Sequence, residues 1–398
     1  MNLSKLSIDG GSPVRSKFLP MRRVNYGYEE LHQILEVFER GVFCSVYPDA
    51  PKVRMLESAF AAYSGSTHAV AFNSGTTAQH ASLVAAGIGP GDEVIIPPLT
   101  FASTAYTILM MGAKPVFADV DDDTIIIDST RVAEAITSRT RAIVPVHWFG
   151  HPAAMEKLLE LADVHRLTVI EDCAHAYGTA YRGKKAGTMG AMACWSLQEG
   201  KMITAAGEGG LLTTNDDRLA EIARSVCDHG KDKGAKQSGS LRYWIVRVGN
   251  NYRLSEIQAA FALAQLNKIE ALRAARKDHT EYLDNALTDL PGLRRPQPWN
   301  DVELSYAYYP LRFDEEYFRV DLSQISAALT AEGIGNATMR EELCPLHPLF
   351  IDHCGTVSLP VAERIARELV LLPLYPDLSR ADLNDIIAAV SKVVATYA

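Results

Sequence analysis

One segment of the chain reads Cys194-Trp-Ser-Leu-Gln-Glu-Gly-Lys201-Met-Ile-Thr-Ala-Ala-Gly207-Glu-Gly-Gly210, and it leads into the strand-like run 211–214. Lys201 stands among small, weakly polar residues, where loss of water lowers the pKa of an amine and frees it to attack a carbonyl. Ser196 could hold a phosphate, and the glycines let backbone and ligand approach closely. A lysine followed by glycines is also common in surface turns. The segment therefore predicts either a reactive lysine or a solvated turn, and the rest of the chain must decide.

The composition limits the class of protein. With 398 residues the chain exceeds one ordinary domain, so we expect two domains around a large core. Its 47% apolar and 22% charged residues are typical of a soluble globular protein. A net charge of −9 provides no basic surface for nucleic acid or for an anionic membrane. We therefore expect small-molecule partners.

Cysteine usage and the N-terminal residues bear on the compartment. The six cysteines form no CxxC pair and no metal-ligand spacing, so we expect reduced thiols and no metal site. The N-terminal residues carry charges at Lys5, Asp9, Arg15 and Lys17 and no apolar run, and no window reaches the roughly 20 apolar residues of a membrane helix. These features predict a cytoplasmic protein.

A phosphate-site pattern follows the first predicted strand. The apolar run 68–72 precedes Asn73-Ser74-Gly75-Thr76-Thr77 and an alanine-rich helix through residue 86. Free N–H groups and the helix dipole favour an anion at the start of such a helix. The hydroxyl of Ser74 or Thr76 would serve equally well as an ordinary helix cap. Both interpretations are open at this point.

Strands and helices then alternate. We expect strands at 93–96, 115–119, 141–147 and 167–171, and helices at 101–111, 130–138 and 153–165. Continuous apolar strands separated by helices predict an α/β fold with a mainly parallel sheet covered on both faces. Ligands bind such sheets beyond the carboxyl ends of the strands. The polar or aromatic residues predicted at those ends are Ser74, Phe101, His147, Asp172 and His175.

Asp172 leaves the buried run 167–171. An acid in that position is costly unless it has a cationic or hydrogen-bonding partner. One interpretation is a carboxylate that pairs with a protonated heterocyclic nitrogen, and the other is a solvated loop acid.

The second half of the chain changes character near residue 280. After a helix at 218–224 and a glycine- and lysine-rich loop at 228–240, we expect one long helix from about 249 to 278, capped by Ser255. An aromatic strand at 304–313 and helices at 322–332, 362–370 and from 379 onward follow. The predicted organisation is an N-terminal arm (1–26), a large domain (27–278) and a smaller C-terminal α+β domain (279–398).

Taken together, these motifs resemble the DegT/DnrJ/EryC1/StrS family of pyridoxal-phosphate aminotransferases, which have fold type I. The resemblance runs from about residue 27 to the end. It is carried by Asn73-Ser-Gly-Thr76, Gly89-Pro-Gly-Asp-Glu-Val94, Thr100-Phe101, Ile170-Glu-Asp172, Gly207-Glu-Gly-Gly210, His229-Gly230, Asn251-Tyr-Arg253 and Pro345-Leu-His347.

The resemblance implies roles around the cofactor ring. Lys201 would carry pyridoxal 5′-phosphate as a Schiff base, Asp172 would pair with the pyridine nitrogen, and Phe101 would stack on the ring. Most of the family has Glu-Asp-Ala-Ala-Gln where this chain has Glu-Asp-Cys173-Ala-His175, so His175 would replace a glutamine beside the phenolic oxygen.

The resemblance also implies how the phosphate is held. Ser74, Gly75, Thr76 and Ser196 would bind it within one subunit, and Asn251 would reach it from a second subunit. The expected assembly is therefore a homodimer with shared active sites.

An aminotransferase moves an amino group from an amino-acid donor to a ketone. The resemblance implies L-glutamine or L-glutamate as donor, and Lys201 argues for aminotransfer because family members with histidine there are dehydratases. Cys173-Ala-His175 and Trp195-Ser-Leu-Gln198 are most similar to the branch that acts on cyclitols and aminohydroxybenzoate precursors. We therefore expect a keto-cyclitol resembling scyllo-inosose, used in the biosynthesis of an aminocyclitol antibiotic or a related natural product.

Two alternatives remain. The first is that the ketone is a nucleotide-linked keto-hexose, whose diphosphate would need a basic groove. The candidates for that groove are Arg22, Arg23, Lys231, Lys233 and Arg247. The chain could also be a regulatory protein that holds the cofactor without catalysis, although an intact Lys201 and Asp172 argue against that class.

Overall fold

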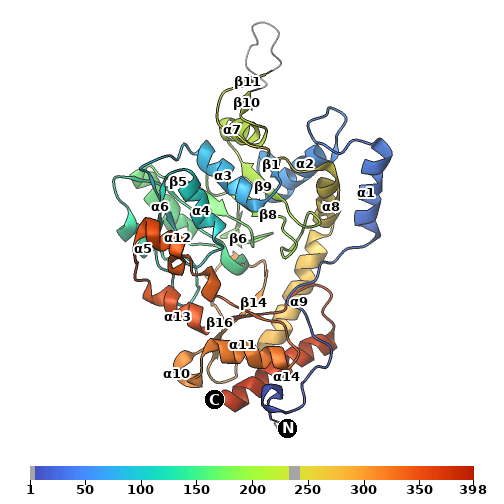
Figure 1. Ribbon diagram of the computed structural model, residues 1–398, viewed down its shortest axis with the longest axis vertical. Coiled ribbons are helices and arrows are strands. Elements are labelled where there is room, and N and C mark those ends of the chain that lie inside the picture. Colours follow the sequence, from blue (N-terminus) through green and yellow to red (C-terminus); the bar gives the residue numbers. More distant parts are fainter. Residues whose placement is uncertain (1–4, 233–242) are drawn as a thin grey trace.

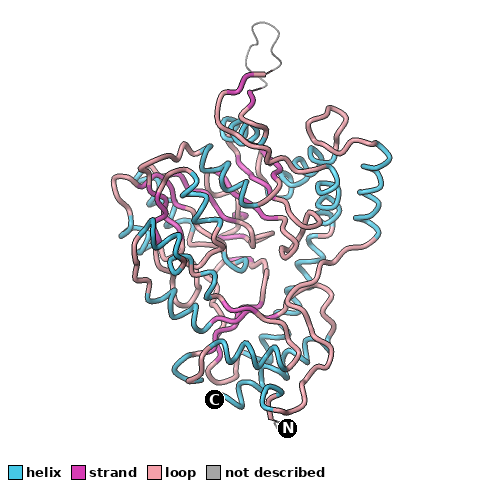
Figure 2. Tube along the Cα trace, viewed as in Figure 1, coloured by secondary structure: helices cyan, strands magenta, loops and turns pink. Residues whose placement is uncertain are grey.

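The computed structural model describes residues 5–232 and 243–398, and its centre is a seven-stranded sheet (Figures 1 and 2). The strand order is β1 (His68–Phe72), β9 (Gly210–Thr214), β8 (Met192–Ser196), β5 (Thr168–Asp172), β4 (Thr140–Ile143), β2 (Glu93–Ile96) and β3 (Lys114–Phe117). Only β9 runs antiparallel to its neighbours, and the pairs from β8 to β3 are parallel. The predicted mainly parallel α/β sheet is confirmed.

Helices surround this sheet. They are α1 (Tyr28–Arg40), α2 (Lys52–Ser64), α3 (Gly75–Ala85), α4 (Ser103–Met110), α5 (Ser129–Ala135), α6 (Met155–His165) and α7 (Asp217–Cys227). Figure 2 shows them as cyan coils around the magenta strands. Because the sheet is covered, β2 and β9 are buried along their whole length, which explains their continuous apolar sequence. The predicted helices match these bounds to within a few residues.

The single helix predicted from about 249 to 278 is wrong. The structure has α8 (Glu256–Asn267) and α9 (Ile269–Leu287), which meet at Lys268. Lys268 N donates to the carbonyl of Gln265, three residues back, so the regular i to i−4 ladder is interrupted there. The predicted cap is confirmed, since Ser255 and Gln258 form a capping box. The predicted domain boundary at 278 falls inside α9, and the division of the chain stays a prediction.

The C-terminal part has a second sheet of four antiparallel strands. Its order is β12 (Leu293–Arg294), β14 (Tyr309–Phe313), β16 (Leu369–Leu372) and β15 (Ala337–Thr338). Around it lie α10 (Glu315–Phe318), α11 (Leu322–Ala331), α12 (Pro348–Cys354), α13 (Pro360–Glu368) and α14 (Arg380–Tyr397). The helix predicted to run to residue 370 ends at Glu368, because the fully buried residues 369–372 pair with β14 and β15 instead. The strand predicted from 304 begins at Tyr309.

The predicted N-terminal arm lies against this C-terminal part. Arg15 N and Leu19 N donate to the carbonyls of Glu332 and Gly333, and the side chains of Leu6 and Leu19 are buried. Figure 1 shows the described start of the chain and the C-terminus at the same end of the molecule.

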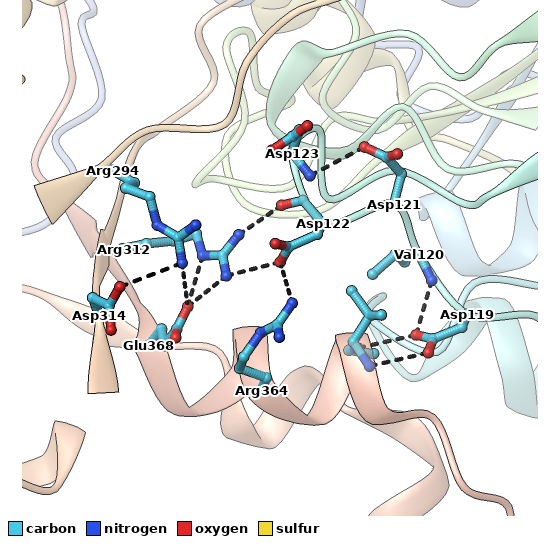
Figure 3. Close-up of polar contacts among 12 residues, drawn as sticks. Asp119, Val120, Asp121, Asp122, Asp123, Arg294, Arg312, Asp314, Arg364 and Glu368 are labelled. Carbon is cyan, nitrogen blue, oxygen red and sulfur yellow. Dashed lines mark hydrogen bonds and ion pairs between the residues drawn. The ribbon is translucent and has the colours of Figure 1, made fainter. Parts of the chain in front are cut away.

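A charged network joins the loop after β3 to the C-terminal part (Figure 3). Arg312 on β14 donates to Glu368 at 2.5 and 2.8 Å. Asp122 forms ion pairs with Arg312 at 2.9 Å and with Arg364 at 2.8 Å. Asp119 accepts the N–H groups of residues 361 and 362, at 3.1 and 2.9 Å, in the first turn of α13. Arg312 and Glu368 are buried, so each needs the other. These contacts fix the second sheet relative to the first.

Two small sheets complete the fold. One pairs β13 (Val302–Glu303), β6 (Ala180–Tyr181) and β7 (Lys184–Lys185), and the other pairs β10 (Lys231–Asp232) with β11 (Trp244–Ile245) in a hairpin that projects from the molecule (Figure 1). Of the loop predicted at 228–240, residues from 233 onward, Lys233 included, lie outside the described residues. No helix within 5–232 and 243–398 is long and apolar enough to cross a membrane.

Candidate active site

A cavity of about 690 Å³ opens at the carboxyl ends of β1, β5 and β8, where the second sheet meets the first. The predicted site residues that line it are Ser74, Gly75, Thr76, Phe101, Asp172, His175, Ser196 and Lys201. They come from segments far apart in sequence. The expectation that ligands bind beyond the carboxyl ends of these strands thus agrees with where the cavity lies.

Lys201 lies in the turn after β8, with its Nζ 2.8 Å from His175 Nε2. Burial lowers the pKa of Lys201 to about 8, against the opposing effect of Asp172, so a large share of the amine is neutral near pH 8. Burial, followed by the nearby Lys201, lowers the pKa of His175 well below its ordinary value and keeps the imidazole neutral. The surface-turn interpretation of Lys201 is therefore wrong.

Asp172 is the last residue of β5 and is 5% exposed, so the solvated-loop interpretation is also wrong. Its Oδ2 accepts from Gln79 Nε2 at 2.5 Å and from Thr104 Oγ1 at 3.0 Å, and its Oδ1 accepts from Ala174 N at 3.0 Å. Burial raises the pKa of Asp172, and the hydrogen bonds from Ala174 and Thr104 oppose that rise. The carboxylate is held at the cavity wall by donors alone.

The start of α3 meets the end of β8. A Cβ added to Gly75 would lie 2.9 Å from Ser196 Cβ, so only glycine allows this approach. The N–H groups of Gly75 and Thr76, in the first turn of α3, have no intrahelical acceptor and are available to an anion. Ser74 Oγ accepts from Thr77 N at 3.1 Å, so Ser74 caps the helix and lines the cavity as well.

Aromatic rings form another wall. Phe101 is 56% exposed at the cavity, and the ring of His175 lies between Trp148 and Tyr308, at centroid distances of 4.8 and 5.3 Å. Trp148 follows the predicted site residue His147, which itself is fully buried and does not line the cavity. A search for site residues that included the residue after each predicted strand-end residue would have found Trp148.

Sequence reasoning missed other lining residues. Gln79 and Ser103 lie inside predicted helices, and Tyr308 and Glu342 come from the C-terminal part. Glu342 had no sequence signal at all, because no motif connects it with the strands of the first sheet.

Asn251 does not line the cavity. It is exposed and forms a backbone bridge with Asp228, and its carbonyl lies 3.4 Å from Asn73 Nδ2. Of the four described basic residues considered for a diphosphate, Arg22, Arg23, Lys231 and Arg247, only Arg22 lines the cavity. The predicted reach of Asn251 into a second subunit stays a prediction.

The cluster His147, Glu171 and Cys173 has metal-like spacing but is already saturated. Glu171 accepts from His147 Nε2 at 2.9 Å and from three backbone N–H groups of the turn 187–190 at 2.7 to 2.8 Å. Four donors fill the acceptor sites of a carboxylate. This arrangement stabilises the turn and leaves Glu171 no free lone pair for an ion.

The donor set fits a planar cofactor with a phosphate at one end and a protonated ring nitrogen at the other. Gly75 and Ser196 leave a cradle that a Cβ would fill, and Asp172 offers a carboxylate to a cationic N–H. The buried His175 Nδ1 and Gln79 Oε1 have no hydrogen-bond partner within the described part of the chain. Unpartnered buried polar atoms beside a cavity indicate a ligand that completes them.

Comparison with known proteins agrees with this chemistry. The profile of the DegT/DnrJ/EryC1/StrS aminotransferase family matches residues 26–391. The spore coat polysaccharide biosynthesis protein SpsC of Bacillus subtilis is 37% identical over 386 residues, which cover 96% of this chain and 98% of SpsC. GDP-perosamine synthase of Caulobacter vibrioides is 40% identical over 344 residues, which cover 85% of this chain and 89% of that enzyme. The X-ray structure of an aminotransferase from Psychrobacter cryohalolentis matches with a TM-score of 0.89 and 28% identity, covering 96% of this chain and 99% of that one.

Proposed function

The chain belongs to the DegT/DnrJ/EryC1/StrS aminotransferase family, and on that premise we propose that it transfers an amino group from L-glutamate or L-glutamine to a nucleotide-linked keto-hexose. It is an aminotransferase of fold type I, and its cofactor is pyridoxal phosphate. The observation that carries the proposed substrate is the 40% identity with a relative named for a GDP-linked product. This choice replaces the keto-cyclitol as the leading substrate.

In this proposal each side chain has a definite task. Bound pyridoxal phosphate supplies the electron sink for the charge that develops at the substrate carbon when its proton leaves. Asp172 would keep the ring nitrogen protonated, Phe101 would pack on the ring, and His175 would offer an N–H to the phenolic oxygen. Lys201, a neutral amine above pH 8, takes the substrate proton and returns it.

A second group of residues would bind the phosphate of the cofactor. The start of α3 and the end of β8 offer N–H groups and hydroxyls that favour an anion. The residues are Ser74, Gly75, Thr76 and Ser196. The N–H groups of Gly75 and Thr76 and the hydroxyls of Ser74, Thr76 and Ser196 make this corner suited to a phosphate.

A polar part of the cavity wall near Lys201 suits a hydroxylated ring. Glu342 lines the cavity, and among the described residues its carboxylate has no hydrogen bond or ion pair. Arg22 also lines the cavity, and a Cβ added to Gly200 would lie 2.7 Å from Arg22 Nη1, so this cation lies close to the Lys201 turn. The carboxylate of Glu342 can accept hydrogen bonds from sugar hydroxyls, and the guanidinium of Arg22 can bind a phosphate.

The second candidate substrate is a keto-cyclitol resembling scyllo-inosose, in the biosynthesis of an aminocyclitol. It is favoured by Cys173-Ala-His175 and by Trp195 before Ser196, the features that resemble the cyclitol branch. Cyclitols carry no diphosphate, so the two candidates differ in whether Arg22 has a partner in the substrate.

A substrate panel separates the candidates. The holoenzyme is incubated with L-glutamate or L-glutamine and, in turn, with GDP- and dTDP-linked 4-keto-hexoses, the free keto-hexoses and scyllo-inosose, and amino products are measured by mass spectrometry. We expect turnover with a nucleotide-linked ketone and a kcat/KM at least about tenfold lower for the free sugar, the loss expected from about one charged contact. Turnover of scyllo-inosose alone would establish the cyclitol instead.

We also propose that the active unit is a homodimer. Tyr28, Leu31, Leu35 and Phe38 lie three or four residues apart on α1, and each is more than half exposed, at 54 to 73%. Figure 1 shows α1 at the edge of the molecule. An exposed apolar stripe of this length is unfavourable in water unless another surface covers it, and a second copy of the chain is the occupant we propose.

Subunit complementation tests whether Asn251 serves the partner's site. Lys201→Ala and Asn251→Asp, whose added carboxylate would repel the phosphate, should each be inactive or nearly so. In a mixed dimer with two-fold symmetry, one site would carry neither lesion and the other both. We expect activity to reappear after subunit exchange, up to about a quarter of the wild-type value for random exchange of equal amounts. If proven exchange restores nothing, Asn251 acts within its own subunit.

A further inference from the structure

Gln79 reaches Asp172 from the helix that also forms the phosphate corner. Residues four apart share a face of a helix, so Gly75 and Gln79 of α3 both point toward the cavity. Gln79 is 8% exposed. Its Nε2 lies 2.5 Å from Asp172 Oδ2 and 3.4 Å from Thr104 Oγ1. One helix thereby contacts both ends of the cofactor site.

The amide orientation follows from the neighbours of Gln79. With Nε2 toward Asp172, a donor faces an acceptor. With Oε1 there instead, two oxygens would face each other at 2.5 Å, which an ionised carboxylate does not allow. Gln79 therefore donates to Asp172 Oδ2, and this hydrogen bond is stronger when Asp172 is ionised.

The hydrogen bonds of Asp172 leave one place open. An ionised carboxylate has about four acceptor sites, and Gln79, Thr104 and Ala174 N fill three of them. All three groups donate to Asp172, and hydrogen bonds of this kind are stronger to the ionised carboxylate than to the neutral acid. The set favours the carboxylate over the acid and leaves about one site for one more N–H.

We propose that Gln79 is a positioning residue that keeps Asp172 ionised and oriented toward the ring nitrogen of the cofactor. This inference rests on the proposed role of Asp172 and is independent of which ketone is the substrate. A purely structural glutamine would have both ends of its amide satisfied. Gln79 Oε1 is buried without a partner in the described part of the chain, a cost that folding alone does not explain.

The test measures the ring nitrogen directly. Holoenzyme is reconstituted with pyridoxal phosphate labelled with ¹⁵N in the ring, and the nitrogen resonance is followed as a function of pH in the wild type and in Gln79→Leu. Without the donated hydrogen bond, burial raises the pKa of Asp172 further and the shared proton moves away from the ring. We expect the apparent pKa of the ring nitrogen to fall by about one to two units. We also expect kcat to fall about 10- to 100-fold with little change in KM for the donor.

Gln265→Leu is the matched control. Gln265 is equally buried, at 2% exposed, and donates at 2.7 Å to Glu30 and to the carbonyl of Asn25, away from the cavity. Its loss should lower the melting temperature and leave the ring nitrogen unchanged. If Gln79→Leu does not fold, Gln79→Met keeps the chain length of the side chain, and the same shift is expected.

Asp172→Asn provides the reference that separates the two claims. If Asp172→Asn leaves the ring nitrogen unchanged, the proposed role of Asp172 itself is wrong. If Asp172→Asn shifts the nitrogen and neither Gln79 variant does, Asp172 keeps its role and the positioning role of Gln79 is overturned.

Discussion

Replacement of Lys201 by alanine should abolish aminotransfer while the chain stays folded. The variant loses the amine that would hold the cofactor and move the substrate proton, and the lost proton transfer alone should cost about 10²- to 10⁴-fold in kcat. We expect loosely held cofactor that gel filtration removes. Turnover with L-glutamate and ketone, together with the cofactor content after gel filtration, measures both effects.

The fold should survive because the buried amine does not stabilise it. The pKa of Lys201 falls from its ordinary 10.5 to about 8 in the folded chain, so folding is penalised below pH 8 and the penalty disappears as the pH rises to 10.5. Lys157→Ala, an exposed lysine on α6, is the control and should keep full activity. A Lys201→Ala enzyme that turns over at a tenth of the wild-type rate or more would contradict the assignment.

The same pKa gives a pH dependence. Only the neutral amine attacks an aldehyde, so uptake of pyridoxal phosphate by cofactor-free protein should accelerate about tenfold per pH unit below 8 and level off above it. Stopped-flow absorbance follows this uptake. A rate that is independent of pH between 6 and 8 would mean that another group controls the reaction.

Replacement of Asp172 by asparagine should have the second largest effect. The change keeps the size of the side chain and removes the charge that would hold the ring nitrogen protonated, so the electron sink weakens. We expect kcat to fall on the order of 10²-fold or more, about 3 kcal/mol of transition-state stabilisation, with the cofactor still bound. Steady-state kinetics at saturating donor and ketone measures the fall.

Asp163→Asn is the control for Asp172, because Asp163 is an exposed carboxylate on α6. It should match the wild type in kcat and in melting temperature. Near-normal turnover of Asp172→Asn would leave Asp172 with a structural role only, as an acceptor for Thr104 and Ala174.

Much of the first sheet could be predicted from the sequence. The apolar runs before Ser74 and Asp172 are continuous because both faces of their strands are buried, and that pattern is local. The strand-end rule then brought Ser74, Asp172 and His175 to one edge without any knowledge of distances, and Lys201 was found from its own segment. The resemblance added their expected roles, which the experiments above test.

The errors have a common physical origin. Gln79 was missed because an alanine-rich helix does not reveal which face meets a neighbouring strand. Glu342 was missed because it reaches the cavity through the packing of a second sheet. The start of β16 after Glu368 depends on pairing with distant strands, and the helix break at Lys268 has no glycine or proline nearby that would have indicated it. Predictions were accurate where the apolar pattern is local and failed where distant segments meet.

The central claim is that Lys201 carries the cofactor at the end of β8. Holoenzyme is reduced with borohydride, digested, and its peptides are mapped by mass spectrometry for the mass of the reduced pyridoxyl phosphate. The account predicts one modified site, Lys201, in the peptide that contains Gly200 and Met202. Modification of a different lysine, with Lys201 recovered unmodified, would contradict it.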